Sequence, residues 1–263
     1  MAESHLSAPK PRTVVGAQPV REALRAHGDG VQKLWLLEGA ARLNGLKRLA
    51  ESLGVPVREV ARAELDRLAE GHAHQGAVCW APPVRMTPAA ELFARHTLIL
   101  ALDGIQDPQN FGAVLGSAVG IAEAAVLWGE HASAPLTPAT FRASAGAIEH
   151  ADLCRVASLP QALLDAQAAG FQIVGLDSHA EQPLTAVDLR LPSVLIVGGE
   201  GRGLSRVVRR HCTQLARLAK PRRIDSLNAS VAAALALYEA QRQRPASEAA
   251  LEPNPPQSHH PLG

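Results

Sequence analysis

Short apolar runs alternate with amphipathic helical stretches twice along the chain. In the first series, four strands are predicted by apolar runs, at Thr13–Val15, Lys33–Leu37, Pro56–Val60 and Ala77–Ala81. Helical spacing followed by a nearby glycine predicts three helices, at Pro19–Ala26, Arg42–Leu53 and Ala63–Glu70. Residues 13–81 are therefore expected to form a small α/β domain.

The second series starts at Thr97 and is longer. The run TLILALD at 97–103 is continuously apolar, as is typical of a strand covered by helices on both faces. Five more strands are predicted, at Ala124–Trp128, Asp152–Val156, Gln172–Leu176, Val194–Val197 and Gln214–Leu218. Helices are expected around 111–121, 138–148, 159–168, 205–211 and 228–243. This alternation predicts a parallel sheet over residues 97–244, with ligands bound in the loops beyond the carboxyl ends of its strands.

The remaining segments have no periodic pattern. Residues 82–96 contain three prolines and are predicted to be an interdomain linker. Residues 1–12 and 245–263 are rich in proline, serine and alanine and are predicted to be disordered tails. No apolar run reaches the roughly 18 residues that span a membrane, and residues 1–12 lack the apolar stretch of a signal peptide. We therefore expect a cytoplasmic protein with no membrane contact.

Composition adds little to this picture. Apolar residues make up 47% of the 263 residues and charged residues 19%, which is ordinary for a globular protein, and the net charge is only +1. The three cysteines (Cys79, Cys154 and Cys212) are far apart and form no CxxC pair. We expect small buried hydrophobes, with neither a disulfide framework nor a metal site.

The first unusual loop follows the strand at 97–103 and reads DGIQDPQNFGA. Asp107-Pro108 and the glycines favour a turn, and Asn110 is placed to cap the helix behind it. An Asp-Pro turn before a helix is common, so this loop alone does not establish a function.

The second unusual loop, VGGEGRGLS at 197–205, carries four glycines in six positions. These glycines allow the backbone to approach a ligand closely near a helix N-terminus. The pattern does not fit the dinucleotide-binding GxGxxG, and Glu200 disfavours a diphosphate because a carboxylate repels it. A cationic ligand suits Glu200 better, and the sulfonium of S-adenosylmethionine is one such cation.

The third loop and its helix read IDSLNASVAAALALYEAQRQ, from Ile224 to Gln243. Ser226 or Asn228 is expected to cap the long alanine-rich helix. Considered alone, this pattern is also that of a plain cap followed by a buried helix.

A strongly basic stretch joins the second loop to the third. It contains no acidic residue and eight basic ones: Arg202, Arg206, Arg209, Arg210, Arg217, Lys220, Arg222 and Arg223. A solvated helix face usually mixes both signs, whereas a cluster of one sign beside a ligand loop favours a polyanion such as RNA.

Taken together, the three loops resemble the three motifs of the SpoU/TrmH branch of the SPOUT RNA 2′-O-ribose methyltransferases. LDGIQDPQNFGA, IVGGEGRGL and DSLNASVAAALALYE look like motifs one, two and three, and RASAGAIEH at 142–150 looks like the helix between them. VVGAQPVREAL and HQGAV in the first domain are similar to the L30e-like RNA-binding domain of bacterial 23S rRNA guanosine 2′-O-methyltransferases. The resemblance covers nearly all of residues 13–244.

The resemblance implies a fold, a cofactor and partners. It implies a C-terminal trefoil knot in which S-adenosylmethionine binds, a homodimer, and RNA, most specifically rRNA, as the substrate. The implied catalytic residues are Asn110, Glu200, Ser226 and Asn228. The implied cofactor-binding residues are Gly198, Gly199, Leu218 and Leu227. The residues expected to bind RNA are Arg142, Arg202, Arg206, Arg209 and Arg210.

Two positions depart from the family pattern. The family places an arginine six residues after the motif-one asparagine, where this chain has Gly116, and residues 218–220 replace an Ile-Pro-Met-like segment. Arg142, Arg202 or Glu200 is expected to take over from the missing arginine. Two hypotheses follow. The chain is an active 2′-O-methyltransferase with an altered base, or a catalytically weak RNA-binding relative such as a ribosome-assembly factor.

Overall fold

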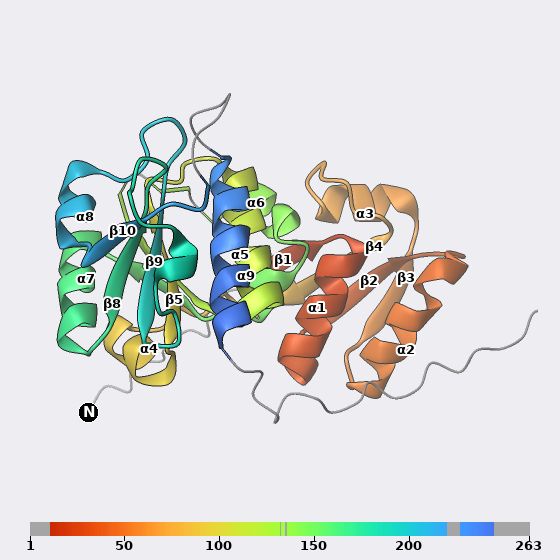
Figure 1. The fold of residues 1–263 in the computed structure, drawn as a ribbon. Coiled ribbons are helices and arrows are strands. Elements are labelled where there is room, and N and C mark those ends of the chain that lie inside the picture. The colour runs from red at the N-terminus through yellow and green to blue at the C-terminus, as the bar shows by residue number, and fades with distance from the viewer. Residues whose placement is uncertain (1–10, 132, 135, 220–226, 245–263) are drawn as a thin grey trace, which may run out of the picture.

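Residues 11–131, 133–134, 136–219 and 227–244 are described by the computed structural model. They form two α/β units, an N-terminal one and a larger C-terminal one (Figure 1). Within these ranges, no helix has the length and apolar character needed to cross a bilayer.

The N-terminal unit is built on a mixed four-stranded sheet within the described residues. In spatial order its strands are β1 (Arg12–Val15), β4 (Ala77–Ala81), β2 (Lys33–Leu37) and β3 (Val57–Val60). Helices α1 (Ala17–His27) and α2 (Asn44–Ser52) pack on one face, and α3 (Arg62–Leu68) packs on the other. Two short 3₁₀ turns complete it, η1 (Gly28–Gly30) and η2 (Ala41–Leu43). The predicted α/β pattern of residues 13–81 thus matches the observed elements.

The C-terminal unit has a six-stranded sheet in the described residues, and every neighbouring pair is parallel. The strands are, in spatial order, β10 (Gln214–Ala216), β8 (Gln172–Leu176), β9 (Ser193–Gly198), β5 (Leu98–Asp103), β6 (Ala125–Gly129) and β7 (Leu153–Val156). The central strands β5 and β9 are continuously buried because helices cover both faces. The predicted parallel sheet is confirmed.

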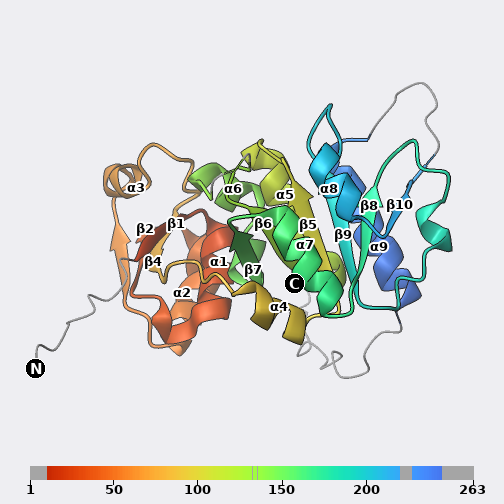
Figure 2. The same ribbon diagram turned by 90° about the vertical axis from the view of Figure 1, so that its left-hand side faces the viewer.

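Helices cover this sheet on both sides. The long helices α5 (Pro108–Ala122) and α9 (Ala229–Gln243) pack together on one face. The other face is covered by α4 (Ala89–Arg95), α7 (Leu159–Ala168) and α8 (Arg206–His211). Helix α6 (Pro138–Ala143) and η3 (Ala147–Glu149) lie toward the N-terminal unit (Figure 2), and η4 (Leu184–Ala186) lies near α9.

Two predicted boundaries need correction. The segment 82–96 is not linker throughout, because residues 89–95 form α4 and Leu92 is fully buried against α7. The helix expected at 138–148 is interrupted, because Ala145 and Gly146 adopt positive φ values of 50° and 91°. At Gly146 a Cβ atom would lie 2.8 Å from the Cβ of Glu22, so the interruption allows α1 to approach closely.

The cysteines are free thiols packed into the two units. Burial raises the pKa of the Cys79 thiol to about 12 and the pKa values of the Cys154 and Cys212 thiols to about 11. At neutral pH all three are therefore protonated and behave as the small hydrophobes that the sequence predicts.

The two units are joined by ionic contacts around Glu149, whose side chain is only 1% exposed. Its carboxylate accepts a hydrogen bond from the Arg12 guanidinium and lies 2.9 Å from Nε2 of His27. A second contact joins Nε2 of His150 to Glu22 at 3.1 Å. A buried carboxylate needs such partners, so Glu149 holds the N-terminal unit against the sheet domain.

We expect Glu149→Gln to lower the free energy of unfolding by about 2 kcal/mol, because Arg12 and His27 lose a charged acceptor in a buried position. Urea denaturation followed by circular dichroism measures this change. The control is Arg190→Ala, which removes an exposed ion pair with Asp188 and should leave the urea midpoint unchanged. Equal midpoints for the wild type and Glu149→Gln would contradict the role given to Glu149.

Candidate functional site

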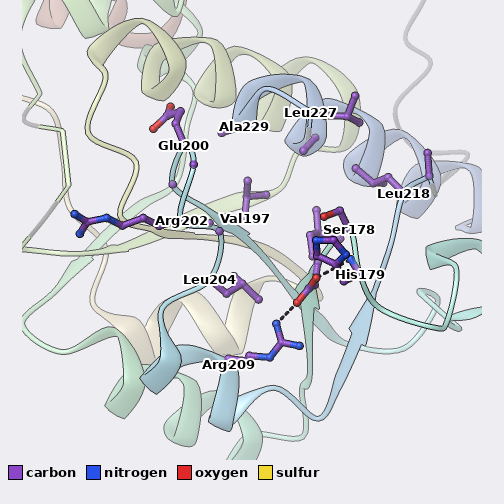
Figure 3. Close-up of a pocket in the computed structure, with 18 residues that line it drawn as sticks. Ser178, His179, Val197, Glu200, Arg202, Leu204, Arg209, Leu218, Leu227 and Ala229 are labelled. Carbon is purple, nitrogen blue, oxygen red and sulfur yellow. Dashed lines mark hydrogen bonds and ion pairs between the residues drawn. The ribbon is translucent and has the colours of Figure 1, made fainter. Parts of the chain in front are cut away.

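A cavity of about 390 Å³ opens beyond the carboxyl ends of β8 and β9 (Figure 3). Three separate parts of the chain supply its walls: residues 176–179 at the end of β8, residues 197–204 at the end of β9 and in the turn behind it, and the segment that leads into α9 with the first turn of that helix. The last part contributes Leu218, Ala219, Leu227, Ala229 and Ala232. The glycine-rich loop and the start of α9 therefore meet at one site, as the sequence predicts.

The glycine-rich turn has no room for side chains at its first two positions. A Cβ atom on Gly198 would lie 2.1 Å from the carbonyl carbon of Gly203, and one on Gly199 would lie 2.3 Å from the carbonyl oxygen of Gly104. Real Cβ atoms do not approach other atoms so closely. The turn can therefore fold back on itself and against the β5–α5 loop only with glycine at both positions.

Asp103, at the end of β5, ties the two loops together. Its carboxylate accepts a hydrogen bond of 2.6 Å from the backbone amide of Ser205, and its carbonyl oxygen accepts one of 2.8 Å from the amide of Gly199. The turn is closed internally by a bond of 3.0 Å from the amide of Gly203 to the carbonyl of Gly199. The position of the second loop is thus set by the first strand of the domain.

Three polar side chains form a hydrogen-bonded row between the three loops. Nδ2 of Asn228 donates to Oδ1 of Asn110 at 3.0 Å, and Nδ2 of Asn110 donates to Oε1 of Glu200 at 2.5 Å. Each residue comes from a different loop, and the row brings together three of the four predicted catalytic positions. The fourth, Ser226, lies outside the described residues.

The caps of α5 and α9 explain how this row is held. Asn110 does not cap α5, because Asp107 takes that role by accepting bonds from the amides of Gln109 and Asn110. The side chain of Asn110 is thus available to the row. Asn228 does cap α9, with Oδ1 bonded to the amides of Ser230 and Val231, and its Nδ2 is left to reach Asn110.

Asp177 and Arg209 form one wall of the cavity, and their ion pair is drawn in Figure 3. Burial alone would raise the pKa of Asp177, but hydrogen bonds from the amide of His179 and from the guanidinium of Arg209 lower it. Asp177 is therefore ionised at neutral pH and fixes the turn after β8. Arg209, one of the residues expected to bind RNA, thus also takes part in the wall of the cavity, with its side chain half-exposed.

The other predicted RNA-binding residues lie outside the cavity or on its rim. Arg202 lines the rim and points away from the cavity (Figure 3), and Arg206 and Arg210 are exposed on α8. Arg142, on α6, borders a small space between the two units. Within the described ranges, none of these four has an ion pair or a side-chain hydrogen bond. Arg217 binds the carbonyl of Ala180, and the basic residues at 220, 222 and 223 lie outside the described part.

Gly116 lies on α5, six residues after Asn110. The nearest heavy atom to a Cβ atom placed there is the carbonyl oxygen of Ser144, at 3.7 Å, which is ordinary van der Waals contact. The helix therefore does not require glycine at this position, and a longer side chain meets no backbone obstacle at its first atom.

Asp103, Asp107 and Asp177 were missed as site residues by sequence reasoning. A signal was present for two of them, since Asp103 ends a predicted strand and Asp177 directly follows one, at the sheet edge where ligands bind. Their partners, Ser205 and Arg209, are distant in sequence, so the contacts themselves leave no trace in the local pattern.

The fold and the site define a class of protein: an α/β domain whose parallel sheet ends in a glycine-lined cavity, preceded by a small α/β unit. The SpoU rRNA methylase family matches residues 97–238, and a family described as RNA 2′-O ribose methyltransferase substrate binding matches residues 13–87. The chain belongs to the SpoU rRNA methylase family.

Individual relatives agree with this membership. The 23S rRNA (guanosine-2′-O-)-methyltransferase RlmB of Pseudomonas aeruginosa is 38% identical over 239 residues, which cover 88% of this chain and 96% of the relative. An uncharacterized tRNA/rRNA methyltransferase of Mycobacterium marinum is 37% identical over 240 residues, 88% of this chain and 77% of the relative. The crystal structure of the SpoU methyltransferase AviRb from Streptomyces viridochromogenes, in complex with AdoMet, is similar with a TM-score of 0.70 and 25% identity, covering 89% of this chain and 90% of that one.

The close backbone approach in the glycine-rich turn is testable by stability. We expect Gly198→Ala to lower the free energy of unfolding by about 1–3 kcal/mol, because the added methyl group must push the backbone of Gly203 away. Gly45→Ala is the matched control, because a Cβ atom on that helical glycine would have no neighbour within 4 Å. Urea titration of both variants checks this. A Gly198→Ala protein as stable as the control would show that the turn has room for a Cβ atom at this position.

Proposed function

We propose that the protein transfers the methyl group of S-adenosylmethionine to a ribose 2′-hydroxyl of RNA, with 23S rRNA as the substrate. The observation that carries the proposal is the hydrogen-bonded row of Asn228, Asn110 and Glu200 on the rim of the glycine-lined cavity. The names of relatives that methylate 23S rRNA support the substrate, and the AdoMet complex of AviRb supports the cofactor.

The residues of the cavity fit this cofactor. The volume of about 390 Å³ lies within the range of ligand pockets, roughly 300–1,000 Å³. Leu218 and Leu227 offer apolar surface for a flat base, and the turn at Gly198 and Gly199 presents backbone with no side chain in front of it. The carboxylate of Glu200 on the rim suits a positively charged ligand. These residues are our proposed cofactor contacts.

S-adenosylmethionine, when bound, supplies an electrophilic methyl group on a positively charged sulfur. The attacking hydroxyl must lose its proton as the new O–C bond forms. In the row, Asn228 orients Asn110 and Asn110 orients Glu200, so the Glu200 carboxylate is the group best placed to accept that proton. Ser226 is proposed as a fourth polar group on family resemblance alone. Arg142 and Arg202 have no partner within the described residues and are proposed to hold a substrate phosphate.

The basic surface supports RNA as the substrate. Arg206 and Arg210 are exposed on α8 beside the cavity wall, and Arg202 extends from its rim. Cations that touch phosphates release counterions, so RNA affinity should fall steeply with salt. The L30e-like N-terminal domain, placed at residues 13–81, is proposed to bind the same RNA, and an rRNA substrate would place the protein in the cytoplasm.

We also propose that two copies of the chain form a dimer. One side of α9 carries exposed apolar side chains at helical spacing: Val231, Leu235 and Tyr238. Such a row on a soluble protein indicates a surface that another chain covers, and a twofold interface would bury it in both copies. We further propose that the chain forms a trefoil knot where it passes from β10 to α9. Residues 220–226 of that passage lie outside the described part.

A catalytically weak RNA-binding relative is the second candidate, and Gly116 is the observation that favours it. The row of Asn110, Glu200 and Asn228 favours the active enzyme, because these side chains are held in contact across three loops. We therefore propose activity with Glu200 in place of the missing arginine.

We expect Glu200→Gln to lower kcat for methyl transfer to rRNA by about 10²-fold or more, because the glutamine cannot accept the proton. Asn228→Ser keeps a helix cap and stability but loses the amide that orients Asn110, so it should also lower kcat. Transfer of labelled methyl groups measures both effects, and calorimetry of S-adenosylmethionine binding is the control. Unchanged kcat in Glu200→Gln would remove Glu200 from the mechanism.

Binding of the cofactor and binding of RNA are expected to depend on different arginines of α8. Arg209→Gln is expected to weaken S-adenosylmethionine binding about tenfold, because Asp177 loses its partner in the cavity wall. Arg206→Gln is the matched control on the same helix and should leave cofactor binding unchanged while reducing the salt dependence of RNA binding by about one unit of slope. Calorimetry and RNA binding at several salt concentrations test both. If both variants changed cofactor binding and RNA binding equally, the separate roles of Arg209 and Arg206 would be refuted.

Gly116→Arg distinguishes the active enzyme from the weak relative. If Glu200 serves as the base, the wild type is active and the added arginine changes kcat by less than about tenfold, a small part of the acceleration that acid–base catalysis provides. The measurement is methyl transfer to rRNA by both proteins at equal concentration. A wild type without turnover and an active Gly116→Arg variant would favour the second candidate.

A further inference from the structure

The N-terminal sheet is covered by a helix on only part of its outer face. Helix α3 packs on Val60, Val78 and Trp35. The adjacent row of the same face runs across three strands, where Trp80 of β4 is paired in register with Thr13 of β1 and Lys33 of β2. Within the described part of the chain, Thr13 and Trp80 are exposed and Lys33 is half-buried.

Trp80 is an exposed aromatic side chain on a rigid support. Trp80 is 37% exposed, whereas Trp35, on the same face of the sheet, is only 4% exposed. The two rings meet edge to face, with centroids 4.8 Å apart and an interplanar angle of 71°. The buried ring therefore fixes the exposed one, which can then stack on a ligand with little loss of conformational entropy.

Positive charge lies on one side of the Trp80 ring. Nζ of Lys33 lies 5.2 Å from the centroid of the Trp35 ring, so its ammonium is held on the face that carries Trp80. Arg58 of β3 is paired in register with Trp35 and is exposed, with Glu64 as a loose partner at 3.5 Å. In the sheet order β1-β4-β2-β3, both cations lie on the same side of Trp80, first Lys33 on β2 and then Arg58 on β3. An aromatic ring with cations to one side matches the chemistry of a nucleotide, which offers a flat base and an adjacent phosphate.

We propose that this strip (Thr13, Lys33, Arg58 and Trp80) binds an unpaired nucleotide of the substrate RNA. The base stacks on Trp80, and Lys33 and Arg58 contact the neighbouring phosphates. The proposal rests on the proposed function, because it assumes that the protein binds RNA. It adds a recognition site for single-stranded RNA in the N-terminal unit. There Trp80 can stack on a base that is not paired in an RNA helix.

The test compares two fluorescein-labelled RNA probes: a hairpin with a loop of unpaired adenosines and a blunt duplex of the same stem. Fluorescence anisotropy gives the affinity of each for the full-length protein. Trp80→Ala should weaken hairpin binding by about five- to 150-fold and leave duplex binding unchanged. Trp80→Phe, which keeps an aromatic ring, should retain most of the hairpin affinity.

Two charge variants complete the design. Lys33→Ala should reduce the salt slope of hairpin binding by about 0.7, the value for one phosphate contact on a single strand. Arg48→Ala is the control, because Arg48 is exposed on α2, which packs on the opposite face of the sheet. It should leave the ratio of hairpin to duplex affinity unchanged. Circular dichroism melting establishes that each variant is folded. If Trp80→Ala does not fold, the Trp80→Phe and Lys33→Ala variants still test the proposal.

Equal hairpin affinity for the wild type and Trp80→Ala overturns the proposal, as does an equal loss for hairpin and duplex. A change in the mass of the assembly without a change in RNA affinity would assign the strip to a protein contact and also overturns it. Methyl transfer to rRNA is measured in parallel. A wild type that methylates rRNA but shows no Trp80 effect loses only this inference, whereas a wild type that neither binds nor methylates RNA loses the proposed function as well.

Discussion

The close packing of backbone against backbone in the turn after β9 is the constraint on which the site depends. Because Gly198 and Gly199 lack side chains, the turn can lie against Gly203 and Gly104 and bring Glu200 beside the β5–α5 loop. Asp103 then holds the arrangement through the amides of Gly199 and Ser205. Any bulkier residue at these two positions would separate the loops, and the row of polar side chains on the rim would come apart.

Asn228 serves two purposes in that row. Its Oδ1 caps the start of α9 by accepting a backbone hydrogen bond, and its Nδ2 donates to Asn110. One side chain therefore sets both the start of the helix and the orientation of the site. Asp107 similarly takes over the capping of α5 and leaves the side chain of Asn110 available. Structural and chemical demands are therefore met by the same few residues, which ties the stability of the loops to their function.

Much of this architecture follows from local sequence. Strands at Lys33–Leu37, Ala77–Ala81 and Gln172–Leu176 match their predicted bounds, because apolar runs between turn residues are a local signal. The meeting of the glycine-rich loop with the start of α9 was also predictable, since both follow strands of one parallel sheet.

The errors share a physical origin in long-range contact. The interruption at Gly146 depends on the approach of Glu22 from the other unit, and α4 is stabilised by burial of Leu92 against α7. The ion pair of Arg209 with Asp177 likewise left no local signal, because the two residues are 32 positions apart in sequence. None of these contacts changes the composition or the periodicity of the segment in which it occurs.

We propose that the glycine-rich turn and the start of α9 enclose the cofactor. Hydrogen–deuterium exchange of the protein with and without S-adenosylmethionine tests it most directly, because it reports which backbone amides become protected. We expect protection confined to residues 176–179, 197–204 and 218–219 and to the segment 227–232, of which Leu227, Ala229 and Ala232 line the cavity. Protection elsewhere in the sheet domain, or none at saturating cofactor, would contradict it.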